Sequence, residues 1–252
     1  MVSILSMSQN LFDTFFSEHG LEFVARAIAA ALDEDGPDLT SRALFARGEN
    51  LRAELVAKEP LVVCGLPLIP MILNALDDVV ASDFDLEWLS ADADAARAGQ
   101  VLARMSGPAA PLLKAERVIL NFLCRLSGIA TQTNRWVRVL AGSHTHLLDT
   151  RKTTPGLRHL EKYAVRVGGG LNHRLDLTQM LMLKDTHLDR AGSIAQAVAA
   201  LRDAYSPCPA IEVECRTLSD VAQAATARVE RIMFDNMSPD EITEALRLVP
   251  PG

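Results

Sequence analysis

The chain has 252 residues, of which 49% are hydrophobic and 23% charged, and its formal net charge at pH 7 is −7. A chain of this length can bury one large core or two smaller ones, and its composition is that of a soluble globular protein. The acidic balance argues against nucleic-acid binding through bulk charge, while a small basic pocket remains compatible with it.

The four cysteines and the apolar segments bear on the cellular compartment. The sequence has no CxxC pair, so we expect reduced thiols in a cytoplasmic protein. The first twelve residues, MVSILSMSQNLF, lack the basic and apolar regions of a signal peptide, and no apolar run approaches the length of a membrane span. We therefore expect neither a membrane nor a nucleic acid as partner.

Residues 1–110 are predicted to form an N-terminal α+β domain. Some segments repeat apolar residues at helical spacing, whereas Leu51 to Lys58 alternate apolar and polar residues as a half-buried strand does. Gly107–Pro108 predicts a boundary at the end of this region. The predicted helices span Phe23–Leu32 and Leu66–Val80, and the predicted strands span Leu51–Lys58, Leu61–Cys64, Leu86–Leu89 and Gln100–Met105.

Residues 111–252 follow a different pattern and are predicted to form a second domain. A long helix is expected over Lys114–Leu140, with a break or a tight contact at Ser127–Gly128. Strands and helices then alternate, which predicts a parallel sheet or an α/β barrel. The predicted strands span 145–149, 170–173, 181–184, 210–214 and 231–235, and the predicted helices span 157–167, 193–205, 218–227 and 239–248.

Polar residues gather at the C-terminal ends of these five predicted strands. In parallel α/β architectures this edge of the sheet carries the active site, so the pattern predicts a functional site there. Five polar strand ends in succession are hard to explain by chance. The residues are Asp149–Lys152, Asn172–Arg174, Lys184–Asp185, Glu214, and Asp235–Asn236.

One of these strand ends, DTRKTTPG at 149–156, holds two adjacent cations, which favours an anionic partner. The surrounding segment from Thr150 to Arg190 contains eight Lys or Arg residues against four Asp or Glu residues, in an otherwise acidic chain. This local excess predicts a small polyanionic ligand. The alternative interpretation is an ordinary charged surface, because Arg158, Lys162 and Arg166 are spaced to lie on one solvated helix face.

Five motifs resemble the quinolinate phosphoribosyltransferase family, also called nicotinate-nucleotide pyrophosphorylases. They occur in the family's order over about half of the chain, and the ordered set is far more specific than any single motif. ALDEDGPDLTS and AELVAKEPLVVCGLPL resemble the family's N-terminal domain more loosely. The five motifs are ERVILNFLCRLSGIAT (116–131), LDTRKTTPGLRHLEKYAVRVGGGLNHR (148–174), LKDTH (183–187), IEVE (211–214) and FDNMSP (234–239).

The resemblance implies an enzyme of NAD biosynthesis. Such an enzyme transfers the phosphoribosyl group of phosphoribosyl pyrophosphate to quinolinate and decarboxylates the product to nicotinate mononucleotide, with Mg²⁺ as cofactor. It also implies an α/β fold, in which an N-terminal α+β open-sandwich domain precedes an α/β-barrel domain. Both substrates are polyanions, which would account for the two adjacent cations.

The resemblance further implies roles for individual residues. Arg151, His173 and Arg174 would hold the quinolinate carboxylates, because arginine forks match carboxylates in a bidentate manner. Lys152 and Lys184 would contact a carboxylate or the phosphate groups, and both are candidate catalytic residues. Arg117 would reach the site of a neighbouring subunit, so a homodimer is expected; pairing with an acid on its own helix is the alternative.

Two acids complete the predicted site. Glu214 and Asp235 match the family's acidic pair beside the ribose and the metal, as catalytic residues and as Mg²⁺ ligands. Glu212 lies on the same face of the predicted strand as Glu214, and the motif position favours Glu214. His144 and His146, two residues apart, are a weaker candidate for a metal site.

The expected barrel is incomplete, because the family continues beyond FDNMSP with glycine-rich loops that bind phosphate, whereas this sequence ends at residue 252. An active enzyme is therefore one expectation. The alternative is a C-terminally truncated or degenerate relative that binds a pyridine diacid, or assembles with a partner, without turnover. A molybdenum-associated relative is disfavoured, because the LKDTH and NHR motifs resemble the quinolinate branch.

Overall fold

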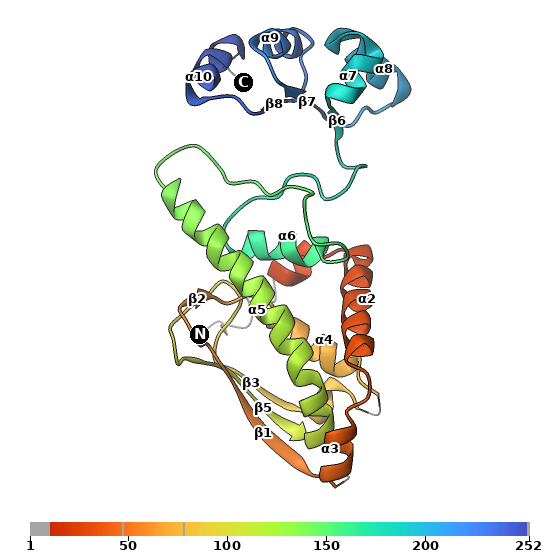
Figure 1. Cartoon of the computed structure of the whole chain (residues 1–252), viewed down its shortest axis with the longest axis vertical. Coiled ribbons are helices and arrows are strands. Elements are labelled where there is room, and N and C mark those ends of the chain that lie inside the picture. Colours follow the sequence, from red (N-terminus) through yellow and green to blue (C-terminus); the bar gives the residue numbers. More distant parts are fainter. Residues whose placement is uncertain (1–10, 47, 78, 251–252) are drawn as a thin grey trace. The chain divides into compact units, whose positions relative to one another are not determined.

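A computed structural model describes residues 11–46, 48–77 and 79–250. The first ten residues and the last two lie outside these ranges, and so does most of the segment on which the expectation about a signal peptide depends. The chain divides into two compact units, Met1–His173 and Arg174–Gly252, which are described here one at a time (Figure 1). None of the helices formed by the described residues is both long enough and apolar enough to cross a bilayer.

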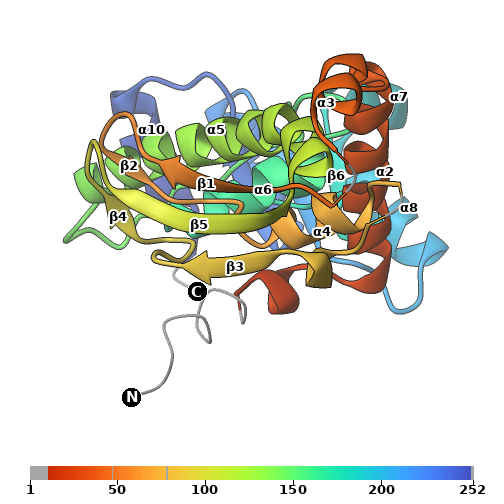
Figure 2. The ribbon, with the colours of Figure 1, turned by 90° about the horizontal axis from the view of Figure 1, so that it is seen from below.

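The first unit contains a three-stranded antiparallel sheet in the order β1-β5-β3. These strands are β1 (Asn50–Val56), β5 (Val101–Pro108) and β3 (Asp85–Trp88), and they confirm the strands predicted over 51–58, 100–105 and 86–89. The long helix α5 (Ala109–Val139) lies against one face of this layer (Figure 2). A second, smaller pairing joins β2 (Leu61–Val62) to β4 (Ala95–Ala96).

Helices surround the core of the first unit. The long helix predicted over Lys114–Leu140 is confirmed as α5, and its residues Val118, Phe122 and Leu126 are buried. The other helices are α2 (Glu18–Asp35), α3 (Leu39–Leu44), α4 (Leu68–Asn74) and α6 (Arg158–Val167).

Of the two alternatives predicted for Ser127–Gly128, the break is wrong, because α5 continues through both residues, and the tight contact is confirmed at Ser127. Its Oγ accepts a hydrogen bond from the Cys64 N–H at 3.1 Å and donates one to the Cys64 carbonyl at 3.3 Å. The small residue therefore marks the point at which the buried backbone after β2 docks on the helix.

Two predicted strands of the first unit are wrong. Segments 145–149 and 170–173 form no strands and meet only at one parallel bridge, between Leu148 and Leu171. The reason lies in the next backbone donor, the N–H of His173, which bonds to a side-chain oxygen of Asp149 at 2.8 Å instead of to a neighbouring strand. The Asp149 side chain thus accepts the hydrogen bond that a neighbouring strand would otherwise accept, and the backbone pairing of the two segments ends there.

Helix α4 is shorter than predicted, because it ends at Asn74 instead of Val80. The Asn74 Oδ1 accepts a hydrogen bond from the Ala81 N–H at 2.6 Å, which stabilises a turn after the helix. Strand β5 is longer than predicted, because it extends through Pro108 instead of ending at Met105.

Asp92 joins three segments in the interior of the first unit. Its carboxylate accepts hydrogen bonds from the N–H groups of Gly65 and Leu66, at 2.8 and 3.0 Å, and from the Tyr163 hydroxyl at 2.8 Å. Burial raises the pKa of Asp92, and these three hydrogen bonds oppose that rise. The contacts tie α6 to the loop that precedes α4.

We expect Asp92→Ala to lower the free energy of unfolding by about 2–5 kcal/mol, because it leaves two backbone N–H groups and a hydroxyl buried without acceptors. Denaturant unfolding measures this change. The exposed acid Asp85 is the matched control, and Asp85→Ala should stay within about 0.5 kcal/mol of wild type. A similar, small effect in both variants would contradict the structural role of Asp92.

The second unit is a parallel sheet in the order β6-β7-β8, with its helices on one side (Figure 1). Its strands β6 (Leu181–Leu183), β7 (Ile211–Cys215) and β8 (Arg231–Phe234) confirm the predictions for this region. Ile211, Val213 and Cys215 are buried in the apolar core. The helices are α7 (Asp185–Ala191), which was not predicted, and α8 (Ile194–Ala204), α9 (Leu218–Thr226) and α10 (Pro239–Leu248), which were.

Candidate functional site

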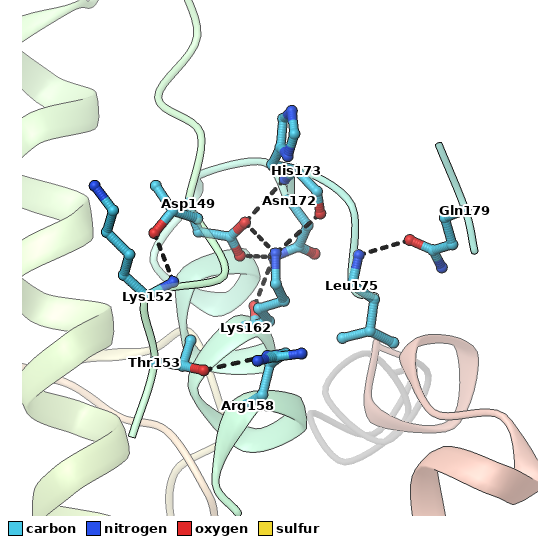
Figure 3. A network of polar contacts seen from close by, with 10 residues as sticks. Asp149, Lys152, Thr153, Arg158, Lys162, Asn172, His173, Leu175 and Gln179 are labelled. Atoms are coloured by element: carbon cyan, nitrogen blue, oxygen red, sulfur yellow. Dashed lines mark hydrogen bonds and ion pairs between the residues drawn. The ribbon is translucent and has the colours of Figure 1, made fainter. Parts of the chain in front are cut away.

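The turn that carries the two adjacent cations is anchored at its first residue, Asp149, in the first unit. Its Oδ1 accepts hydrogen bonds from the Lys162 ammonium at 2.5 Å and from the His173 N–H at 2.8 Å. Its Oδ2 accepts one from the Asn172 amide at 2.6 Å (Figure 3). Both carboxylate oxygens are therefore occupied by groups of α6 and of the segment that follows it.

Lys162 lies inside the protein, and its side chain is only 1% exposed. It also donates a hydrogen bond to the His173 carbonyl at 2.9 Å, while the Asn172 amide donates to the Lys162 carbonyl at 2.9 Å. The interpretation of this helix face as a solvated charged surface is wrong for Lys162. A buried cation with a buried carboxylate as its partner is part of the architecture of the turn.

Glu161 anchors the other end of the same turn. Its Oε1 accepts hydrogen bonds from Nη2 and Nε of Arg125, at 2.6 and 3.1 Å, and its Oε2 accepts one from the Thr154 N–H at 3.1 Å. The Arg125 guanidinium also donates to the Thr154 hydroxyl at 2.8 Å. Burial alone would raise the pKa of Glu161, but the hydrogen bonds from Arg125 and Thr154 outweigh it and hold that pKa below its usual value.

This lowered pKa predicts how stability depends on pH. A carboxylate with a lowered folded-state pKa stabilises the fold above its unfolded pKa of about 4.5, and this contribution is lost as pH falls through the folded value. We therefore expect Glu161→Gln to lower the free energy of unfolding by about 1–3 kcal/mol at pH 7. The difference from wild type should shrink as the pH falls below about 5.

Urea unfolding at a series of pH values measures this effect. The exposed Glu34 of α2 is the matched control, and Glu34→Gln should follow wild type across the whole range. A deficit of Glu161→Gln that is the same at pH 4 and at pH 7 would show that the carboxylate charge does not stabilise the turn.

Between its two anchors the turn presents its two cations. The Arg151 Nε is buried and has no hydrogen-bond partner among the described residues. The Lys152 backbone N–H bonds to the Thr150 hydroxyl at 3.0 Å, and the Lys152 side chain extends away from the network (Figure 3). A buried guanidinium donor without an acceptor is costly by itself and suits an anionic ligand such as a carboxylate.

Two further predicted residues belong to the first unit. His173 is half-buried, and both its backbone N–H and its carbonyl are held by the network around Asp149. Arg117 is exposed on α5 and forms no ion pair with any of the described residues. The structure therefore gives no support to the alternative in which Arg117 pairs with an acid of its own helix.

The second unit brings three of the predicted residues to one edge of its sheet. The register pairs Leu183 with Val213, so Lys184 follows β6 beside Glu214, and its Nζ lies 3.6 Å from the Glu214 Oε2. Asp235 follows β8, and its N–H bonds to the Cys215 carbonyl at 2.9 Å. Glu214 pairs with Met233, two residues before Asp235, so strand alternation places both acids on the same face.

Arg174 and Glu212 are the buried charged residues of the second unit among those described. Arg174 is 9% exposed and donates hydrogen bonds to the Met180 carbonyl at 2.8 Å and to the Met182 sulfur at 3.3 Å. Glu212 is 3% exposed, whereas the Glu214 side chain is 20% exposed and lies beside Lys184. Accessibility therefore favours Glu214 over Glu212 as the acid that meets a ligand.

The acids of the second unit can be tested for their fit to Mg²⁺. Among the residues that the structure describes, no group of three or more His, Cys, Asp or Glu side chains is arranged to hold a metal ion. Mg²⁺ commonly takes one or two protein carboxylates and completes its shell with water and substrate phosphate, so Glu214 and Asp235 fit this requirement. His144 and His146 are both exposed and belong to no such group.

Comparison with known proteins places the chain in one family. The family model "Quinolinate phosphoribosyl transferase, C-terminal domain" matches residues 129–251, and the model of the corresponding N-terminal domain matches residues 38–127. A Bacillus subtilis protein named probable nicotinate-nucleotide pyrophosphorylase (carboxylating) is 44% identical over 213 residues, which cover 84% of this chain and 72% of that protein. The human protein named nicotinate-nucleotide pyrophosphorylase (carboxylating) is 38% identical over 221 residues, covering 87% of this chain and 72% of the relative.

Solved structures agree with this relationship. NadC from Streptococcus pyogenes has a TM-score of 0.82 and 39% identity, covering 88% of this chain and 78% of that one. The nicotinate-nucleotide pyrophosphorylase from Francisella tularensis has a TM-score of 0.83 and 36% identity, covering 90% of this chain and 79% of that one. The predicted mixed α/β fold is confirmed at this level.

Proposed function

Because the chain belongs to the quinolinate phosphoribosyltransferase family, we propose that it transfers the phosphoribosyl group of phosphoribosyl pyrophosphate to quinolinate. The products are nicotinate mononucleotide, pyrophosphate and carbon dioxide, and the reaction serves NAD biosynthesis. The observation that carries this proposal is the anchored cationic turn, in which the buried Arg151 Nε lacks an acceptor. That donor suits a carboxylate of the dianionic acceptor.

The residues of the first unit would recognise quinolinate. The Arg151 guanidinium offers a planar pair of donors to one carboxylate, and the Lys152 ammonium adds a mobile point charge that can meet a carboxylate or a phosphate. His173, held by its backbone, contributes a ring that can donate a hydrogen bond. By family resemblance, Arg174 also contacts the quinolinate carboxylates.

The residues of the second unit would act on the phosphoribosyl donor. The pyridine nitrogen forms a bond to C1 of the ribose, while the bond from C1 to pyrophosphate breaks and its electron pair leaves with the pyrophosphate. Positive charge develops at C1, and the Glu214 and Asp235 carboxylates stabilise it because they place fixed negative charge on one face of the sheet. Lys184 balances Glu214 in the free protein and can meet a substrate phosphate or carboxylate.

Decarboxylation follows from the charge that transfer creates. The carbon–carbon bond to the carboxylate beside the ring nitrogen breaks, and its electron pair stays on the ring carbon next to the cationic nitrogen. A proton from solvent then completes nicotinate mononucleotide.

Glu214 and Asp235 would hold the Mg²⁺, which, when bound, neutralises negative charge on the pyrophosphate leaving group.

We infer further properties of the protein from the family and from the described residues. The exposed, unpaired Arg117 supports a homodimer in which it acts across the interface. The free cysteines and the net charge of −7 support a cytoplasmic enzyme with neither a nucleic-acid nor a membrane partner. The antiparallel strands precede residue 110 and the parallel ones follow it, which supports an open-sandwich domain over 1–110 and an α/β-barrel-type domain over 111–252.

The release of both small products tests this function. Purified protein is incubated with quinolinate, phosphoribosyl pyrophosphate and Mg²⁺, and pyrophosphate and carbon dioxide are measured together. We expect the two to appear in equal amounts and only when quinolinate is present. Nicotinate, which lacks the second carboxylate, should release no carbon dioxide. Quinolinate binding without either product would favour the alternative of a relative that binds a pyridine diacid without turnover.

A further inference from the structure

We propose that Asp149 and Lys162 are positioning residues, which hold the Arg151–Lys152 turn and His173 in the geometry that binds the dianionic acceptor. This inference rests on the proposed function. Neither residue contacts the substrate in this account. Each acts through the segments that it joins, and neither is among the residues to which the family resemblance assigns a role in binding or catalysis.

The pair lies where the two substrate-binding segments of the first unit meet. The Asp149 side chain is 8% exposed and that of Lys162 1% exposed, so both charges have been withdrawn from water. Asp149 is two residues before Arg151, and its carboxylate bonds to the His173 N–H, while the Lys162 ammonium bonds to the His173 carbonyl. The pair thus holds the His173 backbone on both of its polar sides (Figure 3).

Burying such a pair is a costly way to obtain stability alone. Desolvation of two ions consumes most of their mutual attraction, and apolar replacements of similar volume are often neutral or stabilising. An ion pair with three further hydrogen-bonding groups does supply a defined position, because each bond constrains distance and direction. The Arg151–Lys152 turn and the segment with His173 must both contact one small ligand, so each needs such a fixed position.

The network also keeps the neighbouring cations available. A carboxylate two residues from a guanidinium is a natural partner for it, yet no ion pair joins Asp149 to Arg151 or Lys152 among the described residues. Lys162, Asn172 and the His173 N–H occupy both oxygens of Asp149 instead. The Arg151 donor therefore stays available to the ligand, because a different, buried cation, Lys162, pairs with Asp149.

A mutant cycle tests the proposal. The variants are Asp149→Asn, Lys162→Met and the double variant, with Lys162→Arg as the conservative replacement. The measurements are the thermal midpoint, the Kd of quinolinate by calorimetry, and the separate KM values of quinolinate and of phosphoribosyl pyrophosphate. Arg166→Met is the matched control, because it removes another cation of α6, whose contact is a 3.4 Å hydrogen bond to the Gly170 carbonyl.

We expect each single variant to raise the Kd and the KM of quinolinate by about 10- to 100-fold, since small displacements of binding groups have effects of this size. The KM of the phosphoribosyl donor should stay within about twofold of wild type, and so should every value for Arg166→Met. Lys162→Arg should recover part of the loss. The double variant should recover the thermal midpoint, because no buried charge is left unpaired, without recovering quinolinate affinity.

Recovery of both the midpoint and quinolinate affinity in the double variant would overturn the proposal, because it would show a purely structural pair. Single variants with wild-type quinolinate KM would overturn it as well. If neither single variant folds, Asn172→Ala decides, because it removes one bond to the Asp149 carboxylate and one to the Lys162 carbonyl while both buried charges stay in place. An unchanged quinolinate Kd in this variant would refute the proposal. A wild-type protein that neither binds nor converts quinolinate would instead refute the proposed function.

Discussion

Arg151→Ala should weaken quinolinate binding by about 30-fold or more while the protein stays folded. The Arg151 Nε is buried without an acceptor among the residues that the structure describes, so removing the guanidinium costs the fold little. In the complex the same change leaves a substrate carboxylate without its partner. Truncating one side of a buried charge pair costs about 2–5 kcal/mol, which corresponds to a 30-fold to several-thousand-fold rise in Kd.

Calorimetric titration with quinolinate measures this effect. Arg151→Lys should give an intermediate Kd, because lysine keeps the charge and loses the planar fork. The exposed Arg135 of α5, which contacts Gln132, is the matched control, and Arg135→Ala should bind quinolinate as wild type does. A Kd for Arg151→Ala within about threefold of wild type would remove Arg151 from the site.

Glu214→Gln and Asp235→Asn should have the opposite signature, a loss of turnover with quinolinate binding retained. Both changes keep the size of the side chain and remove the negative charge that would face the developing positive charge at the ribose. We expect kcat to fall by about 100- to 1,000-fold in each variant, which is the usual effect of losing one preorganised electrostatic partner. Because quinolinate is bound by other residues in this account, its Kd should change by no more than about twofold.

Steady-state kinetics together with calorimetry separates these two effects. Glu244→Gln is the matched control, because Glu244 is an exposed acid on α10 and its replacement should leave kcat unchanged. A rise in quinolinate Kd equal to the loss in kcat/KM would contradict the assignment, since it would place Glu214 or Asp235 with the acceptor.

The sequence predicts the second unit well because its pattern is local. Short apolar strands such as Leu181–Leu183 end in single polar residues, and parallel register then brings Lys184 beside Glu214 without further information. The helices of this unit are short and amphipathic, with polar caps such as Ser238 before α10. Periodicity and capping are both readable from a single sequence.

The anchors of the cationic turn could not be found in the same way. Lys162 lies thirteen residues after Asp149, and Arg125 lies thirty-six residues before Glu161, so each pair meets only when α6 has docked. The local sequence also gives no signal that Lys162 is buried, because Glu161 precedes it and its neighbours at i−4 and i+4 are arginines. A buried cation requires a buried partner, and nothing in the sequence around Lys162 identifies Asp149 as that partner.

The central claim is that this protein makes nicotinate mononucleotide, and one measurement tests it most directly. Purified protein, with its mass confirmed, is incubated with quinolinate, phosphoribosyl pyrophosphate and Mg²⁺, and the nucleotide product is identified by mass spectrometry, with Arg151→Ala run in parallel. The account predicts nicotinate mononucleotide from wild type and none from the variant. No product from wild-type protein that binds both substrates would contradict it.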